Sequence, residues 1–234
     1  MFYYRAADAR GSANFGWLNS QHTFSFGNYY DPEHMGISVL RVINDDIVAA
    51  GAGFGEHGHR DMEIISYILE GSIEHKDSMG NQFIVPAGDV QRMSAGTGIM
   101  HSEFNASATE PLKFLQIWIS PNVKGVAPSY EQMSVVQSST MTALITPDGH
   151  DGSLSINQNA SLSRLKLRPG EHYDLAAQKH VGYLHVIEGD ALTESATDEH
   201  ALKPGDGLGI IKDKLLLTAG DEGLVALWFD LPSK

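Results

Sequence analysis

Two short segments of the sequence carry side chains that could bind a transition metal. Residues 57–59 read His-Gly-His and residues 101–103 read His-Ser-Glu. Each segment places two donor side chains at positions i and i+2, which face the same side of a β-strand roughly 6.6 Å apart. Two such pairs on facing strands could close a site of three imidazoles and one carboxylate. This donor set suits iron, manganese, cobalt, nickel, copper or zinc and leaves positions open for substrate and water.

A single His-x-His pair is more often an ordinary polar sequence in a turn, because histidine is commonly half-buried without any ligand. Here both pairs follow Gly-rich turn sequences, at 51–55 and 94–98, and apolar strand-like segments come after both. The repeated context favours a metal site over two unrelated turns.

Composition limits the classes of protein that the chain can belong to. The 234 residues, 42% of them hydrophobic, can form one large β domain or two small ones, and no segment approaches the length of a membrane span. The net charge of −13, without a basic cluster, argues against direct nucleic-acid binding and against an anionic membrane surface. Cysteine is absent, so a metal would need His, Asp, Glu or water ligands. The N-terminal residues lack the pattern of a secretory signal, and we expect a cytoplasmic protein.

Many short strand-like segments separated by turn residues predict an all-β barrel or sandwich. The sequence predicts strands at 37–42 and 47–50, with a turn at Asn44-Asp45-Asp46 between them. Residues 121–141 are rich in Pro, Ser and Gln and are typical of a connector.

The second half of the chain repeats the first in outline. Residues 67–71 match 185–189, the Pro-Gly turn at 86–89 matches 204–206, and the strand around Trp118 matches the strand around Trp228. The second half lacks residues where the first half has 94–103, and no His-x-His precedes its strand. The repeat therefore predicts a second β unit without metal ligands.

These features resemble the cupin superfamily and, within it, the pirins. The first cupin motif is closely matched in residue type and spacing by Gly51, His57, His59, Glu63 and Gly71. The segment 80–88 is similar to the start of the second cupin motif. Cupins usually place a histidine where this chain has Gln91. The later His-Ser-Glu at 101–103 resembles the pirin arrangement instead. The likeness is strongest over 17–132 and is greatest to the bacterial pirin-like quercetinases.

The resemblance implies two tandem cupin barrels, a bicupin, with an N-terminal barrel at 1–130, a connector at 131–145 and a metal-free barrel at 146–234. It implies one divalent transition metal, with Fe(II) the first expectation and Mn, Co, Ni, Cu or Zn as alternatives. The implied ligands are His57, His59, His101 and Glu103. Glu63, often a ligand in other cupins, is expected to support the site or the strand.

The resemblance further implies a dioxygenase that cleaves a flavonol such as quercetin with dioxygen, with Glu103 as the proton acceptor. Apolar side chains near the ligands could hold a flat substrate: Phe54, Met93, Met100 and Phe104. For any single one of these residues, a place in the barrel core is the more common role. Two other hypotheses stay open. The chain could be a metal-containing regulator that binds a protein partner, with flavonol cleavage incidental, or a metal-stabilised β scaffold without turnover.

Overall fold

The regular structure of the protein is almost entirely β-strand, which confirms the all-β prediction. The computed structural model describes residues 2–194, 199–211 and 214–233, and the side chain of residue 2 is outside this description. Two short 3-10 helices, η1 (Ala7–Ala9) and η2 (His150–Gly152), accompany the strands. No helix within the described ranges is long and apolar enough to cross a membrane.

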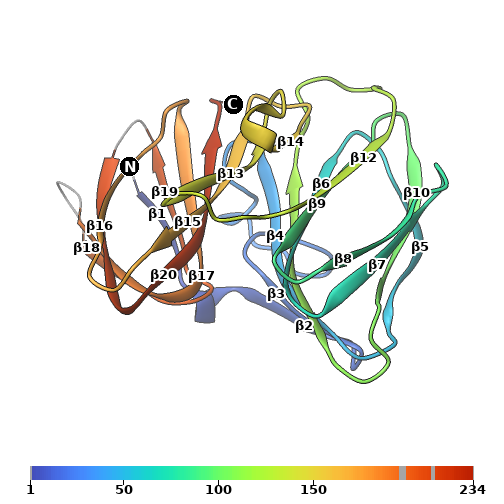
Figure 1. Ribbon diagram of the computed structural model, residues 1–234, viewed down its shortest axis with the longest axis horizontal. Coiled ribbons are helices and arrows are strands. Elements are labelled where there is room, and N and C mark those ends of the chain that lie inside the picture. Colours follow the sequence, from blue (N-terminus) through green and yellow to red (C-terminus); the bar gives the residue numbers. More distant parts are fainter. Residues whose placement is uncertain (1, 195–198, 212–213, 234) are drawn as a thin grey trace.

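Three sheets, in which most neighbouring strands are antiparallel, form two β units that lie side by side (Figure 1). The large N-terminal sheet contains, in order, β12 (Ser129–Ser134), β9 (Asp89–Ser94), β6 (Glu63–Glu70), β11 (Leu112–Ile119), β4 (Leu40–Val48), β3 (Leu18–His22) and β2 (Gly11–Asn14). The small N-terminal sheet contains β5 (Gly53–His59), β10 (Ile99–Asn105), β7 (Ser72–Asp77) and β8 (Gln82–Pro86).

The C-terminal sheet forms the second β unit. It contains β1 (Phe2–Arg5), β19 (Gly207–Ile211), β17 (Val181–Glu194), β20 (Lys214–Leu231), β15 (Ser161–Leu167), β13 (Met141–Thr146) and β14 (Leu154–Ser155), with β16 (His172–Ala176) beside β20 and β18 (Glu199–Leu202) beside β17. Strands β17 and β20 are long enough to pair along three stretches separated by two shifts of register. Such shifts bend a sheet, which lets these two strands wrap around their own core.

The predicted internal repeat is confirmed by matching backbone contacts in the two halves. In the first half the N–H of Gly88 donates to the carbonyl of Ile68, and in the second the N–H of Gly205 donates to the carbonyl of Val186, both at 2.9 Å. The two glycines have φ angles of 88° and 87°, a left-handed conformation that favours glycine. The same kind of turn therefore occurs at the equivalent place in both halves of the chain.

The first and last strands of the N-terminal half depart from the simple order of the chain. Strand β1, at the extreme N-terminus, pairs with β19 and lies in the C-terminal sheet (Figure 1). Strand β12 pairs with β9 and extends the large N-terminal sheet, within the segment expected to be a connector. The division at residues 130 and 145 stays a prediction, although backbone pairing carries the first sheet at least to Ser134.

The predicted turn at Asn44-Asp45-Asp46 is wrong, because these residues lie in the middle of β4. Strand β4 pairs with β3 on one side and with β11 on the other, so its backbone groups are used on both edges. Asn44 and Asp46 are buried, at 1% and 2% exposure. Their polar side chains face the interior of the N-terminal half instead of marking a solvent-exposed turn.

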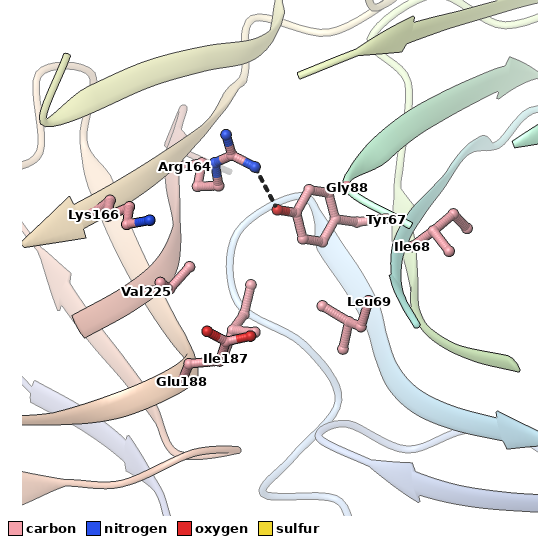
Figure 2. A pocket seen from close by; sticks show the side chains of 9 residues that line it. All are labelled: Tyr67, Ile68, Leu69, Gly88, Arg164, Lys166, Ile187, Glu188 and Val225. Carbon is pink, nitrogen blue, oxygen red and sulfur yellow. Dashed lines mark hydrogen bonds between the residues drawn. The ribbon is translucent and has the colours of Figure 1, made fainter. Parts of the chain in front are cut away.

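The two halves share one apolar core and several polar contacts. Residues from both halves, among them Phe24, Ile65, Leu144 and Leu227, belong to the same buried cluster. Across the junction, Arg164 Nη1 donates to Tyr67 Oη at 3.1 Å, beside a cavity of about 230 Å³ (Figure 2). This junction cavity is lined by residues of β6, β15, β17 and β20, and the predicted metal ligands are on other strands.

Candidate metal centre

The small N-terminal sheet brings the two predicted ligand pairs together. Strands β5 and β10 pair with His101 opposite His57, so these two side chains point to the same face. His59 lies two residues farther along β5, opposite Ile99. A shift of register between His101 and Glu103 places Glu103 opposite Phe54. Strand alternation thus turns all four predicted ligands toward the large N-terminal sheet.

The three histidines form a compact cluster with nitrogen atoms directed at one another. Donor atoms of His57, His59 and His101 all lie within 4.8 Å of each other. His57 Nδ1 donates to the carbonyl of Gly55 at 2.8 Å, which leaves its Nε2 with a free lone pair. That Nε2 lies 3.1 Å from His101 Nε2. Two facing imidazole nitrogens at this distance fit a cation that both could bind.

Glu103 supplies the negative charge of the cluster. Its side chain is 1% exposed, and its Oε1 accepts hydrogen bonds from Ser66 Oγ at 3.1 Å and Gln91 Nε2 at 2.9 Å. Its Oε2 is buried without a hydrogen-bond partner. A buried carboxylate oxygen without a partner carries a large desolvation cost, which a bound cation would offset. The residues of the cluster therefore fit a divalent metal.

The surroundings keep two of the imidazoles neutral, which is the form that binds metals. Burial lowers the pKa of His59 to about 4, and positive charge on His101 or His57 would lower it in the same direction. Burial also lowers the pKa of His101 to about 3, with a further contribution from His57 and His75. Because protons compete with metals for the same lone pairs, low pKa values favour metal binding at neutral pH.

Sequence reasoning missed His75 and Asp77, which lie on β7 beside β10. His75 is opposite Glu103, and Asp77 is opposite His101. His75 Nε2 donates to Asp77 Oδ2 at 3.1 Å, and donor atoms of His75, His101 and Glu103 lie within 4.8 Å of one another. The signal was present, since His75-x-Asp77 has the same i, i+2 spacing as the two recognised pairs.

Gln91, at the position where cupins usually have a histidine, has a distinct role in this structure. Its Nε2 donates to Ser66 Oγ at 3.0 Å as well as to Glu103, and its Oε1 lies 2.9 Å from Tyr130 Oη. Burial raises the pKa of Tyr130, so its hydroxyl keeps the proton that it donates. Tyr130 also stacks on His75 with ring centroids 4.5 Å apart. The hydrogen bonds of Gln91 therefore hold the carboxylate of Glu103 in place.

We predict that Gln91→Met weakens metal binding by about tenfold, because partners that orient a metal ligand typically contribute ten- to a hundredfold in affinity. Met retains the length of the side chain but cannot donate to Glu103. The measurement is a metal titration in competition with a chelator of known affinity. Gln132→Met is the matched control, since Gln132 is exposed on β12 and contacts Tyr130 instead of Glu103. Equal affinities in the two variants would contradict this role for Gln91.

The predicted substrate-contacting residues occupy different environments. Phe54 lines a large cavity of the N-terminal half. Met93 is 2% exposed and packs in an apolar cluster with Ile64 and Ile99. Met100 and Phe104 are 40% and 37% exposed, since they alternate with His101 and Glu103 along β10 and so point away from the ligands.

Glu63 lies at the junction of the two halves. Its Oε2 accepts from Ser94 Oγ at 2.7 Å, and its Oε1 accepts from Asn157 Nδ2 at 3.1 Å. Asn157 belongs to the C-terminal half of the chain. The contacts of Glu63 therefore connect the halves, and they involve none of the four predicted ligands.

A polar row of side chains crosses the large N-terminal sheet below the metal cluster. Successive strands place these residues opposite one another on the inner face: His22, Asn44, Gln116, Ser66, Gln91 and Gln132. One end of the polar row bonds to Glu103 through Ser66 and Gln91. The other end, His22, Asn44 and Gln116, lines a cavity of about 630 Å³. The polar row thus includes residues that bond to Glu103 and residues that line this large cavity.

The two β units define a bicupin. Within the described residues, the N-terminal unit holds two groups of potential metal ligands that share His101, one with His57 and His59 and one with His75 and Glu103. The comparisons with known proteins agree with this class. The Pirin family model matches residues 4–119, and the model of the quercetinase C-terminal cupin domain matches residues 143–231. The chain belongs to the pirin family.

Relatives match the chain over its whole length. It is 47% identical over 234 residues to quercetin 2,3-dioxygenase of Escherichia coli K12, covering 99% of both chains. The crystal structure of the bacterial pirin YhhW from Escherichia coli in complex with nickel(II) is 46% identical, with a TM-score of 0.93 and full coverage of both chains. A quercetin 2,3-dioxygenase from Acinetobacter baumannii shares the fold, at 19% identity and a TM-score of 0.75 over 99% of this chain and 86% of that one.

Proposed function

We propose that this protein is a metal-dependent dioxygenase that cleaves a flavonol such as quercetin. The observation that carries the proposal is the buried Oε2 of Glu103, without a hydrogen-bond partner, in a side chain grouped with His75 and His101. His101 is grouped in turn with His57 and His59, and a large cavity with aromatic walls lies in the same half of the chain. The full-length likeness to a quercetin 2,3-dioxygenase supplies the substrate class. In the reaction, both atoms of dioxygen enter the ring-opened ester, and one ring carbon leaves with its oxygen as carbon monoxide.

His57, His59, His101 and Glu103 would hold the metal. Bound there, a divalent transition metal would supply Lewis-acid and redox chemistry at its open coordination positions. Fe(II) is our first proposal for the native metal, with Mn, Co, Ni, Cu or Zn as alternatives. The crystal structure of the related YhhW in complex with nickel(II) supports a divalent metal of this series.

The protein itself would position the substrate and accept its proton. Glu103 Oε2 can take the proton of the flavonol 3-hydroxyl, because its other oxygen is held by Ser66 and Gln91. The aromatic walls of the cavity can hold the flat rings and limit the access of water to the reacting carbon. The indole ring of Trp118 is roughly perpendicular to the ring of His59, with ring centroids 5.0 Å apart, and would limit the rotation of that imidazole.

The test is a turnover assay on protein loaded in turn with each of these metals. Oxygen uptake, loss of quercetin absorbance and release of carbon monoxide should occur in equal molar amounts, and metal-free protein should be inactive. Consumption of quercetin without carbon monoxide would indicate unspecific oxidation and contradict the proposal. If every metal binds and none supports turnover, the protein is better explained as a metal-containing regulator, and a protein partner should be sought.

A further inference from the structure

None of the four predicted ligands lines the large cavity, but two of its wall residues lie opposite Glu103 or a partner of Glu103. Phe54, on its wall, is opposite Glu103 in the small N-terminal sheet. Gln116, also on its wall, is opposite Ser66, which donates to Glu103. Its volume of about 630 Å³ falls in the range of roughly 300–1,000 Å³ that is typical of sites for small organic ligands. A ligand anchored at the cluster would therefore extend into this cavity.

The far end of the cavity combines flat apolar walls with polar groups that lack partners. Trp17 and Phe26 contribute aromatic surface. His22 Nδ1 and Asn44 Oδ1 are buried without a hydrogen-bond partner, in side chains that are 5% and 1% exposed. Buried polar atoms of this kind usually have partners, and leaving them unpaired costs free energy. A bound ligand with polar hydrogens would satisfy them.

Asp46 adds a carboxyl group to the same surface. It lies next to Asn44 along the inner face of β4, accepts a hydrogen bond from Ser20 Oγ and lines the cavity. Burial raises the pKa of Asp46 to about 7. Near neutral pH this carboxyl group can therefore either donate or accept a hydrogen bond, which suits a phenolic hydroxyl.

We propose that Asn44, Asp46 and Gln116 bind the hydroxyl groups of the aromatic ring that the substrate holds away from the metal. These residues then determine which flavonols the enzyme prefers, while the histidines and Glu103 act on the common 3-hydroxyl end. This assignment rests on the proposed function, because it takes the flavonol as the ligand that reaches from the cluster into the cavity.

The experiment compares three flavonols on the metal-loaded protein: quercetin, galangin, which lacks the hydroxyls of the pendant ring, and 3-hydroxyflavone, which keeps only the 3-hydroxyl. For each one, kcat/KM and the dissociation constant, from fluorescence quenching without oxygen, are measured. We expect the wild type to prefer quercetin over 3-hydroxyflavone. Asn44→Leu and Gln116→Met should reduce this preference roughly tenfold, as expected for the loss of one hydrogen bond to a buried group. Galangin keeps the hydroxyls of the fused ring and lacks those of the pendant ring. Its kcat/KM and dissociation constant therefore show which of the two rings these residues bind.

Two variants keep the test independent of folding defects. Asp46→Asn preserves the size of the side chain and should also reduce the preference. Asp45→Asn is the matched control, because Asp45 faces the other side of β4 and pairs with Arg10 at 3.7 Å. The Asp45→Asn protein should therefore prefer quercetin over 3-hydroxyflavone as strongly as the wild type does. Unchanged preference in all three cavity variants, or a wild type that binds no flavonol, would overturn the assignment. A wild type that binds with this preference but shows no turnover would overturn only the proposed function.

Discussion

Replacing Glu103 with glutamine is expected to lower metal affinity and flavonol turnover by more than about a hundredfold, since even the partners of a metal ligand contribute ten- to a hundredfold. Glutamine keeps the shape of the side chain and can still bond to Ser66 and Gln91. It removes the negative charge of the buried Oε2, the one carboxylate oxygen of the cluster that has no partner. Metal content after dialysis and oxygen uptake with quercetin measure the two effects.

Glu63→Gln is the matched control for this prediction. Glu63 is equally buried, at 1% exposure, but its oxygens bond to Ser94 and Asn157 at the junction of the halves. We expect this variant to retain the metal and the turnover, with a loss only in the free energy of unfolding. If Glu63→Gln released the metal and Glu103→Gln retained it, the site would resemble other cupins more than our assignment allows.

The approach of the predicted ligands to one another could be expected from the sequence because a strand turns every second side chain to one face. His57 and His59, and likewise His101 and Glu103, need only two neighbouring strands to meet. The same alternation places Met100 and Phe104 on the opposite face of β10 from His101 and Glu103. A spacing rule is therefore as informative about the residues that it excludes as about those it selects.

Other features depended on contacts between distant parts of the chain. The segment Asn44-Asp45-Asp46 has the composition of a turn, but β3 and β11 pair with it from both sides and make it a central strand. Composition could not show that its polar side chains face an internal cavity. Similarly, no local pattern in residues 2–5 indicates that this strand joins β19, about two hundred residues later.

Relative to the wild type, Asp46→Asn is expected to be more stable at alkaline pH than at acidic pH. Burial raises the pKa of Asp46 from 3.8 to about 7 in the folded protein. A carboxyl group with a raised folded pKa favours folding fully below the unfolded pKa and loses this contribution as the pH rises through the folded value. The free energy of unfolding of the variant minus that of the wild type should therefore increase by about 2 kcal/mol between about pH 5 and pH 8. Denaturant unfolding at equal metal content measures this difference.

Ser20→Ala tests the same carboxyl group from the opposite direction. The hydrogen bond from Ser20 lowers the pKa of Asp46 and so offsets part of the effect of burial. Removing the hydroxyl should raise this pKa further, so the loss of stability should extend to higher pH than in the wild type. The double variant Ser20→Ala/Asp46→Asn should then have the pH dependence of Asp46→Asn alone, because no carboxyl group is left at this position to titrate. A pH dependence that is the same in the wild type and in Asp46→Asn would show that the buried carboxyl group is already ionised at acidic pH.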